Sequence, residues 1–190
     1  IVIANSVESA PVELSRKDIF LALAAQVPGA AEGELIDNPY TTWNQVNSAL
    51  PDIAIEVLGP PPTSGTRDAF AELALEGGCK KFAWIKAMKK TDKSAYKALC
   101  HTIREDGAYI EAGENDNLIV QKLQVNPAAR GIFGFSFLDQ NADKVQGANI
   151  ESVEPTVESI ADKSYPIALP LYFYVKKAHV GVVPGIEGYL

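Results

Sequence analysis

Residues 53–70 read IAIEVLGPPPTSGTRDAF, and this stretch decides the fold. Its first part, residues 53–58, alternates β-branched residues with other types and predicts a strand. The three prolines that follow form a stiff, extended connection, and none of them can donate a backbone hydrogen bond. From Gly65 the pattern becomes helical, with apolar residues returning to one face. The stretch therefore predicts a strand, a tight loop and a helix in direct succession.

The junction between this strand and this helix carries Ser64, Gly65, Thr66 and Arg67. A helix start leaves backbone N–H groups unpaired and has a partial positive charge, so anions bind there readily. Gly65 would let an anion approach the backbone, two hydroxyls can donate hydrogen bonds, and Arg67 offers a planar fork of donors. These residues predict a cradle for a tetrahedral oxyanion. The alternative is an ordinary Ser or Thr helix cap followed by an exposed arginine.

Strands and helices alternate on both sides of this junction, which predicts an α/β layered sheet. The expected strands are residues 1–4, 53–58, 108–111, 132–138, 145–150 and 169–175. The expected helices run from a Ser15–Asp18 capping box to Pro28, around Trp43 behind Thr41 or Thr42, from Gly65 to Gly77 and Gly78, over 93–104, from a cap at Asn115 or Asp116 to Asn126, over 155–161, and from Pro184 onward.

Length and charge limit the class of protein. The chain has 190 residues, enough for one domain or one and a fraction. Its 17 basic and 24 acidic side chains give a net charge of −7, which disfavours general nucleic-acid binding. No apolar run reaches the roughly 20 residues that a membrane-spanning helix needs. The chain opens directly on a strand-like segment without a starting Met, so we expect a processed chain or a piece of a longer one.

Other candidate chemistry is weaker. Two carboxylate pairs, Glu105 with Asp106 and Glu114 with Asp116, resemble the acid pairs of glycosidases but stand near helix ends, where solvated acids are common. No metal-ligand pattern, nucleophile elbow or cofactor motif is present, so we expect no metal, no cofactor and no catalytic residue. Asn115 and Asp116 could line the same cleft as the oxyanion cradle or act as plain helix caps.

The two cysteines, Cys79 and Cys100, lie 21 positions apart. They form no CxxC pair and have no neighbouring zinc-ligand pattern. Their spacing alone leaves a disulfide and two buried thiols equally open.

Residues 60–70 resemble the phosphate-binding loop of the periplasmic phosphate-binding proteins of ABC transporters, whose fold is the type II periplasmic-binding-protein fold. The resemblance extends along most of the chain. It includes IVIAN at 1–5, TWNQVN at 42–47, NPAARGIFG at 126–134, and residues 165–166 with 171–175.

The resemblance implies a two-lobed protein in which phosphate lies between the lobes. Residues 1–175 would be the second, phosphate-contacting lobe, a central mixed sheet flanked by helices, and residues 176–190 would begin the return to an absent first lobe. Ser64, Gly65, Thr66 and Arg67 would contact phosphate. Some family members carry their key arginine four residues before the serine, where this chain has Pro60, so Arg67 would supply the charge alone.

The same resemblance implies a non-catalytic, monomeric, periplasmic or secreted protein that delivers inorganic phosphate to an ABC permease. Secretion would favour a disulfide between Cys79 and Cys100. Two other functions stay open. One is a phosphate-processing enzyme that uses the same cradle, and the other is a signalling or adhesion module that has lost the ligand.

Overall fold

The computed structural model describes residues 1–169 and 174–189. Strands are β1 (Val2–Ser6), β2 (Glu13–Leu14), β3 (Gln26–Pro28), β4 (Leu35–Asp37), β5 (Val57–Gly59), β6 (Tyr109–Glu111), β7 (Arg130–Phe133), β8 (Val145–Gly147) and β9 (Asn149–Ile150). Helices are α1 (Arg16–Leu23), α2 (Trp43–Val46), α3 (Gly65–Phe70), α4 (Glu76–Cys79), α5 (Ala83–Thr91), α6 (Lys93–His101), α7 (Asp116–Val125), α8 (Phe135–Gln140), α9 (Val157–Ala161) and α10 (Ile186–Tyr189), with a 3₁₀ turn at Lys177–His179.

A five-stranded mixed sheet organises the chain, in the order β6-β5-β7-β1-β8. Strands β6, β5 and β7 are parallel to one another, whereas β1 runs antiparallel to both β7 and β8. All five residues of β1 are buried, as expected of a strand enclosed by neighbours on both sides. Because β5, β6 and β7 are parallel, their carboxyl ends meet at one edge of the sheet. The predicted α/β class with a central mixed sheet is confirmed.

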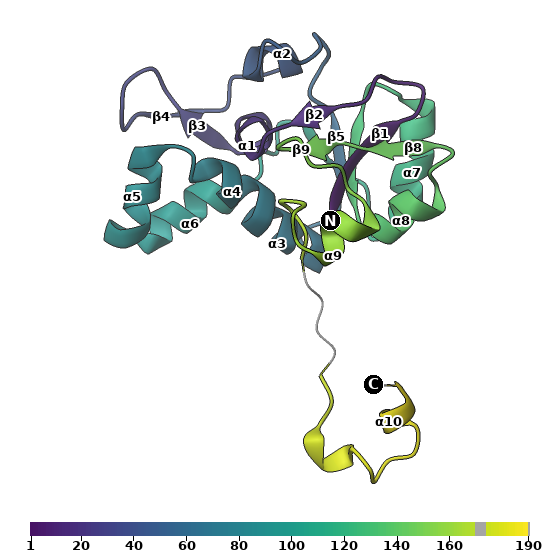
Figure 1. Cartoon of the computed structure of the whole chain (residues 1–190). Helices are drawn as coiled ribbons and strands as arrows, with labels where there is room; N and C mark the ends of the chain where they lie inside the picture. The colour runs from purple at the N-terminus through teal and green to yellow at the C-terminus, as the bar shows by residue number, and fades with distance from the viewer. Residues whose placement is uncertain (170–173, 190) are drawn as a thin grey trace.

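Helices cover both faces of this sheet (Figure 1). On one side, α7 packs against β7, and a Cβ at Gly131 would lie only 2.6 Å from Ile119 of that helix. On the other side lie α1, α4, α5 and α6. The capping box predicted at the start of α1 is present. The Ser15 side chain accepts a hydrogen bond from the Asp18 N–H, and the Asp18 side chain accepts one from the Ser15 N–H. Of these helices, α1 and α7 contribute to the main core against the sheet, with Ile19 and Leu23 from α1 and Ile119 and Leu123 from α7.

The helix that begins at Gly65 is longer than the sequence predicts. It runs from α3 through a π-helical turn at Ala71–Leu75 and on to the end of α4. We expected Gly77 and Gly78 to end it, and that expectation is wrong. A Cβ at Gly78 would lie 1.9 Å from the backbone oxygen of Arg16, so this glycine serves the close crossing of α1 and α4 rather than a helix end.

A second core lies away from the sheet, between α1, α4, α5 and α6. Its largest fully buried side chains include Phe20, Ile85 and Tyr96. Cys79 and Cys100 form a disulfide inside it, with their Cα atoms 5.6 Å apart. The disulfide that the resemblance favours is therefore confirmed, and it joins α4 to α6.

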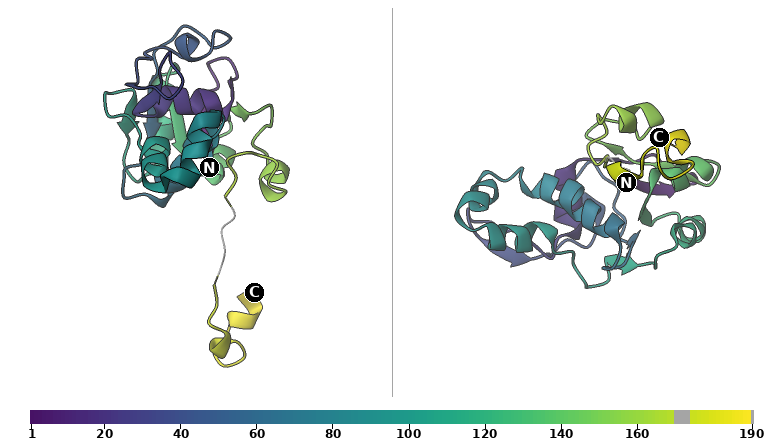
Figure 2. Two further views of the ribbon diagram at one scale, coloured as in Figure 1. Left: turned by 90° about the vertical axis from the view of Figure 1, so that its left-hand side faces the viewer. Right: turned by 90° about the horizontal axis from the view of Figure 1, so that it is seen from below.

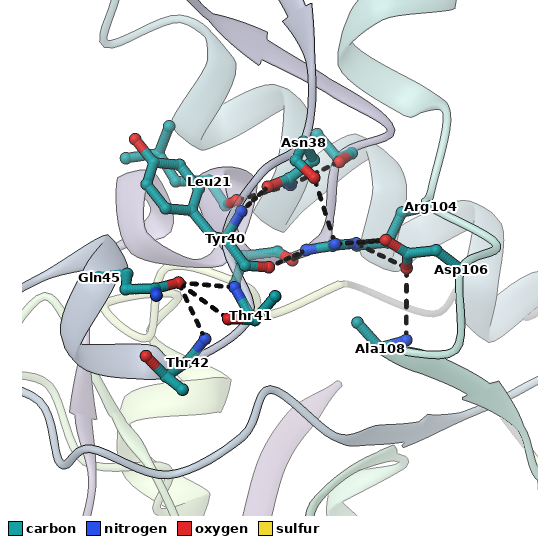
Figure 3. Close-up of polar contacts among 11 residues, drawn as sticks. Leu21, Asn38, Tyr40, Thr41, Thr42, Gln45, Arg104, Asp106 and Ala108 are labelled. Atoms are coloured by element: carbon teal, nitrogen blue, oxygen red, sulfur yellow. Dashed lines mark hydrogen bonds and ion pairs between the residues drawn. The ribbon is translucent and has the colours of Figure 1, made fainter.

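Arg104 fastens a long connection to this second core (Figure 3). Its guanidinium donates to the carbonyl oxygens of Ala22 (3.1 Å) and Tyr40 (2.7 Å) and pairs with Asp106. Hydrogen bonds from Arg104 lower the pKa of Asp106. We expected Arg104 to lie in a helix over residues 93–104, but α6 ends at His101 and the arginine faces inward from the loop that follows. Asp106 is thus a structural partner of Arg104.

Several other boundaries differ from those expected. Residues 132–138 form no continuous strand, because Gly134 caps α8 and places Phe135 and Phe137 in that helix. Residues 26–28 are a strand of a short hairpin rather than the end of α1. Residues 145–150 divide between β8 and β9, which belong to different sheets. Within residues 53–58, only 57 and 58 belong to β5.

The C-terminal segment lies apart from the sheet (Figures 1 and 2). It contains the 3₁₀ turn at Lys177–His179 and the short helix α10, close to the helix expected from Pro184 onward. The strand expected over residues 169–175 falls largely outside the described residues. Among the helices in the described part of the chain, none has both the length and the apolar character needed to cross a membrane.

Candidate functional site

The oxyanion cradle expected at residues 64–67 lies at the carboxyl edge of the sheet. β5 ends at Gly59, the prolines carry the chain across the edge, and α3 begins at Gly65. Ser64 caps this helix, because its Oγ accepts a hydrogen bond from the Thr66 N–H at 3.2 Å. In open α/β sheets, ligands bind outside the carboxyl ends of the strands. The residues that the sequence predicts to bind an anion therefore lie where this fold class binds ligands.

The backbone at the start of α3 is open to an incoming group. The N–H groups of Arg67 and Asp68 both donate to the Ser64 carbonyl, at 3.0 and 3.3 Å. Within the described part of the chain, the Gly65 N–H has no hydrogen-bond partner. A Cβ built at Gly65 would meet no atom within 4 Å. An oxyanion therefore has free space and an unpaired donor at this position.

The guanidinium of Arg67 is held against two residues of β6. Its Nη1 lies 3.0 Å from Oε1 of Glu111, and its Cζ lies 4.9 Å from the centre of the Tyr109 ring. The Tyr109 hydroxyl donates to the Pro60 carbonyl at 2.7 Å, an approach that only glycine allows at position 59, since a Cβ there would lie 2.2 Å from that hydroxyl. Burial raises the pKa of Tyr109 to about 12, and this effect outweighs the nearby positive charge of Arg67, which lowers that pKa. The guanidinium is therefore fixed beside the cradle, and a carboxylate already engages it.

Asn115 and Asp116 come from the start of α7, at the same edge. Asn115 acts as the helix cap, because its Oδ1 accepts from the Asn117 N–H at 3.0 Å. Asp116 reaches the end of β7, where its Oδ2 accepts from the Gly134 N–H at 3.3 Å. Burial raises the pKa of Asp116, and the nearby charge of Glu114 adds to the effect. Of the two, Asp116 reaches a neighbouring strand, whereas Asn115 caps its own helix.

The sequence interpretation did not consider Glu111 as a site residue, and it considered Glu114 only as half of a carboxylate pair. Glu111 pairs with Arg67, and Glu114 accepts a hydrogen bond from the Thr63 hydroxyl at 2.6 Å, which ties the cradle loop to the segment before α7. The signal for Glu111 was present, since it ends a predicted strand that a parallel sheet would set beside residues 53–58.

A third acidic residue, Glu76, organises charges far from this edge. It is 5% exposed and contacts Lys80, Lys89 and His101 at 2.6, 3.0 and 2.7 Å. Burial opposes its ionisation, but the hydrogen bonds from Lys80, His101 and Lys89 outweigh burial and hold its pKa well below the usual range. Within the described residues, no group of three or more His, Cys, Asp or Glu side chains is arranged to hold a metal ion. The Glu76 cluster is therefore an ion-pair network beside the disulfide.

Comparisons with known proteins agree with this architecture. A family model described as "PBP superfamily domain" matches residues 1–190. The phosphate-binding protein PstS of Staphylococcus haemolyticus is 32% identical over 141 residues, which are 72% of this chain and 36% of that protein. Protein SphX of Synechococcus elongatus is 29% identical over 151 residues, covering 74% of this chain and 37% of that protein. The chain thus spans little more than a third of the length of these curated relatives.

Solved structures give the same result for the fold. PstS from Borrelia burgdorferi superimposes with a TM-score of 0.58 at 18% identity, over 87% of this chain and 53% of that one. An ABC-type phosphate transport receptor from Vibrio cholerae gives a TM-score of 0.53 at 18% identity, over 87% of this chain and 52% of that one. The expected periplasmic-binding-protein-like fold is confirmed. Because the family match extends from the first residue to the last, the chain belongs to the PBP superfamily domain family.

Proposed function

We propose that this chain is the phosphate-contacting lobe of a two-lobed solute-binding protein that serves a phosphate ABC transporter. Residues 1–175 form this lobe in the proposal, and residues 176–190 begin the return to the other lobe. The observation that carries the proposal is the unpaired Gly65 N–H with open space around it, beside two hydroxyls and Arg67. The names of the relatives, PstS and a phosphate transport receptor, support phosphate as the anion.

Ser64, Gly65, Thr66 and Arg67 would hold the anion by hydrogen bonds alone. The start of α3 contributes N–H groups and its positive dipole, and the two hydroxyls can rotate to donate to the oxyanion. Arg67 would leave Glu111, or share its fork with it, when the anion arrives. Asp116 lines the same edge and is the candidate acceptor for a phosphate proton. The cradle binds without breaking a bond, so the proposed protein is not an enzyme.

Closure of a second lobe over this edge would bury the anion among fixed donors, where each charge-assisted contact strengthens because water is excluded. The proposed location is periplasmic or secreted, in agreement with the buried disulfide, since such bonds persist in oxidising compartments. The proposed partner is the permease that would accept phosphate from the closed protein.

Calorimetric titration of this chain with phosphate and with sulfate tests the proposal. We expect weak phosphate binding that Arg67→Ala and Gly65→Ala each reduce at least tenfold, while circular dichroism of both variants stays unchanged. Titration of the full-length protein then separates a half-site that needs its other lobe from a fold without the function. Failure of the full-length protein to bind any oxyanion contradicts the proposal, and release of phosphate from an aryl phosphate would indicate an enzyme instead.

A further inference from the structure

A pocket of about 1000 Å³ opens at the edge of the sheet opposite the candidate phosphate cradle. Strands β5 and β7 run parallel and pair Val57 with Arg130 at their amino ends. Ser64 follows the carboxyl end of β5, whereas Arg130 is the first residue of β7 and lines this pocket. The loop over residues 9–15 and the connection over residues 47–53 form the other walls. The pocket is therefore separate from the site of the proposed function.

Arg130 is a buried charge with no counter-ion among the residues that the structure describes. It is only 3% exposed, and its Nη1 donates to the carbonyl oxygens of Ala128 and Ala129 at 2.9 and 3.2 Å. In residues 1–169 and 174–189, no carboxylate pairs with it, and its Nε and Nη2 donate no hydrogen bond. Arg104, the other buried arginine, pairs with Asp106. Because a buried charge without a partner is costly, Arg130 is suited to an anionic group supplied from outside.

A buried acceptor lies beside Arg130. The register of β1 and β7 pairs Ala4 with Gly131, which sets Asn5 opposite Arg130. The Asn5 Oδ1 is buried and, among the described residues, has no hydrogen-bond partner. Its Nδ2 donates to the carbonyl of Ala10, a residue of the pocket wall. An acceptor without a partner thus lies behind the wall of the pocket, on the strand beside Arg130, and buried polar groups are seldom left unsatisfied.

The rest of the lining limits the class of ligand. Three carboxylates line the pocket: Glu13 in β2, Asp18 at the start of α1, and Glu151, which already pairs with Arg16 and Lys81. Most of the remaining wall is apolar, with Val12, Leu50 and Ile53 among its residues. A simple anion would meet Glu13 and Asp18, which no basic side chain of the described residues neutralises, and a simple cation would meet Arg130. A zwitterion with an apolar body satisfies both charges and the walls.

We propose that this pocket binds an apolar α-amino acid, whose carboxylate pairs with Arg130 and whose ammonium group faces Asp18 and Glu13. Three compounds of one carbon skeleton test this in the 190-residue chain: L-leucine, 4-methylpentanoate and 3-methylbutylamine. Each is titrated while backbone amide resonances are followed by NMR. We expect L-leucine alone to give saturable shifts at residues 9–15 and 47–53, with a dissociation constant of about 1 mM or tighter.

Two variants locate the site. Arg130→Met keeps the apolar stem and should weaken L-leucine binding at least tenfold without lowering the melting temperature, since it removes an unpaired buried charge. Arg67→Met, at the opposite edge, should leave L-leucine binding unchanged. Equal binding of 4-methylpentanoate would overturn the zwitterion assignment. No shifts with any of the three compounds would mean that the pocket holds only water, and would overturn the proposal whatever the phosphate titration shows.

Discussion

Arg67 and Glu111 pair across the carboxyl ends of two neighbouring strands, with 3.0 Å between Nη1 and Oε1. An anion that binds at Gly65 therefore competes with a carboxylate for the same guanidinium. Half of the Glu111 side chain is exposed, so the pair itself contributes little stability. If the cradle binds phosphate as proposed, Glu111 would adjust the strength of that binding more than it stabilises the fold.

Glu111→Gln should strengthen phosphate binding by up to about fivefold, because it frees Arg67 and removes a negative charge beside the anion. Calorimetry at constant ionic strength measures the change. Glu32→Gln, an exposed carboxylate in the loop between β3 and β4, is the matched control and should have no effect. Weaker binding by Glu111→Gln would show that Glu111 positions Arg67 rather than competing for it.

Removal of the disulfide should destabilise the chain and leave the cradle intact. Closing a loop over the 21-residue separation of Cys79 and Cys100 removes about 3 kcal/mol of unfolded-chain entropy. The double variant Cys79→Ser, Cys100→Ser should lose about that much in urea denaturation. Its phosphate affinity should be unchanged, because the disulfide lies in the second core. Identical urea midpoints for the chain with and without reductant would contradict this prediction.

The Glu76 network should make stability depend on pH. Glu76 has a pKa below its usual 4.5 in the folded chain, so its contribution is complete above that value. That contribution should decline as pH falls below 4.5 toward the lowered folded value, because the unfolded chain then binds the proton first. Glu76→Gln should cost about 1–3 kcal/mol at pH 7 and flatten the acid limb of a stability–pH curve. The exposed Glu72→Gln on the same helix serves as control, and an unchanged acid limb in Glu76→Gln would rule the network out as its cause.

Two glycines on one helix should respond oppositely to alanine. Gly78→Ala forces a methyl group against the Arg16 carbonyl and should destabilise the chain by about 1–3 kcal/mol or more. Gly65→Ala meets open space and should keep the melting temperature, while its methyl group intrudes where phosphate would bind. Thermal denaturation and phosphate titration of both variants check the pair. A stable Gly78→Ala protein would mean that α1 and α4 are not packed closely there.

Local signals in the sequence predicted the elements whose ends are set by nearby residues. The Ser15–Asp18 box starts α1, Asn115 caps α7, and the prolines after residues 53–58 lead into a helix at Gly65, as expected. The anion-binding pattern was visible for the same reason, since it depends on four consecutive residues. Its relation to Glu111 required one further step, since the predicted strand that ends at Glu111 had to be set beside residues 53–58, and strand order is not fixed by a local pattern.

The errors lie where packing between distant segments overrides the local pattern. Gly78 was expected to end the helix because helices often end at glycine. It lies inside the helix instead, because the close crossing with α1 leaves no room for a Cβ there. The alternating residues at 132–138 are typical of a strand, yet β7 ends at Phe133. Phe135 and Phe137 belong to α8 instead. Arg104 was expected to lie in the helix over residues 93–104, whereas it follows that helix and donates hydrogen bonds to three backbone carbonyls that hold it inward.

The π-helical turn at Ala71–Leu75 gives the long helix one residue more than a regular α-helical path would use. Phe70, before the turn, packs in the main core, and Cys79, after it, packs in the second. In an uninterrupted α-helix of the same sequence, Cys79 would be rotated by about 100° from its present direction. The helix therefore contains a spare residue. Deletion of one residue within the π turn would keep Phe70 directed into the main core and Cys79 into the second. Deletion of a residue in α4 would instead turn Cys79 away from Cys100.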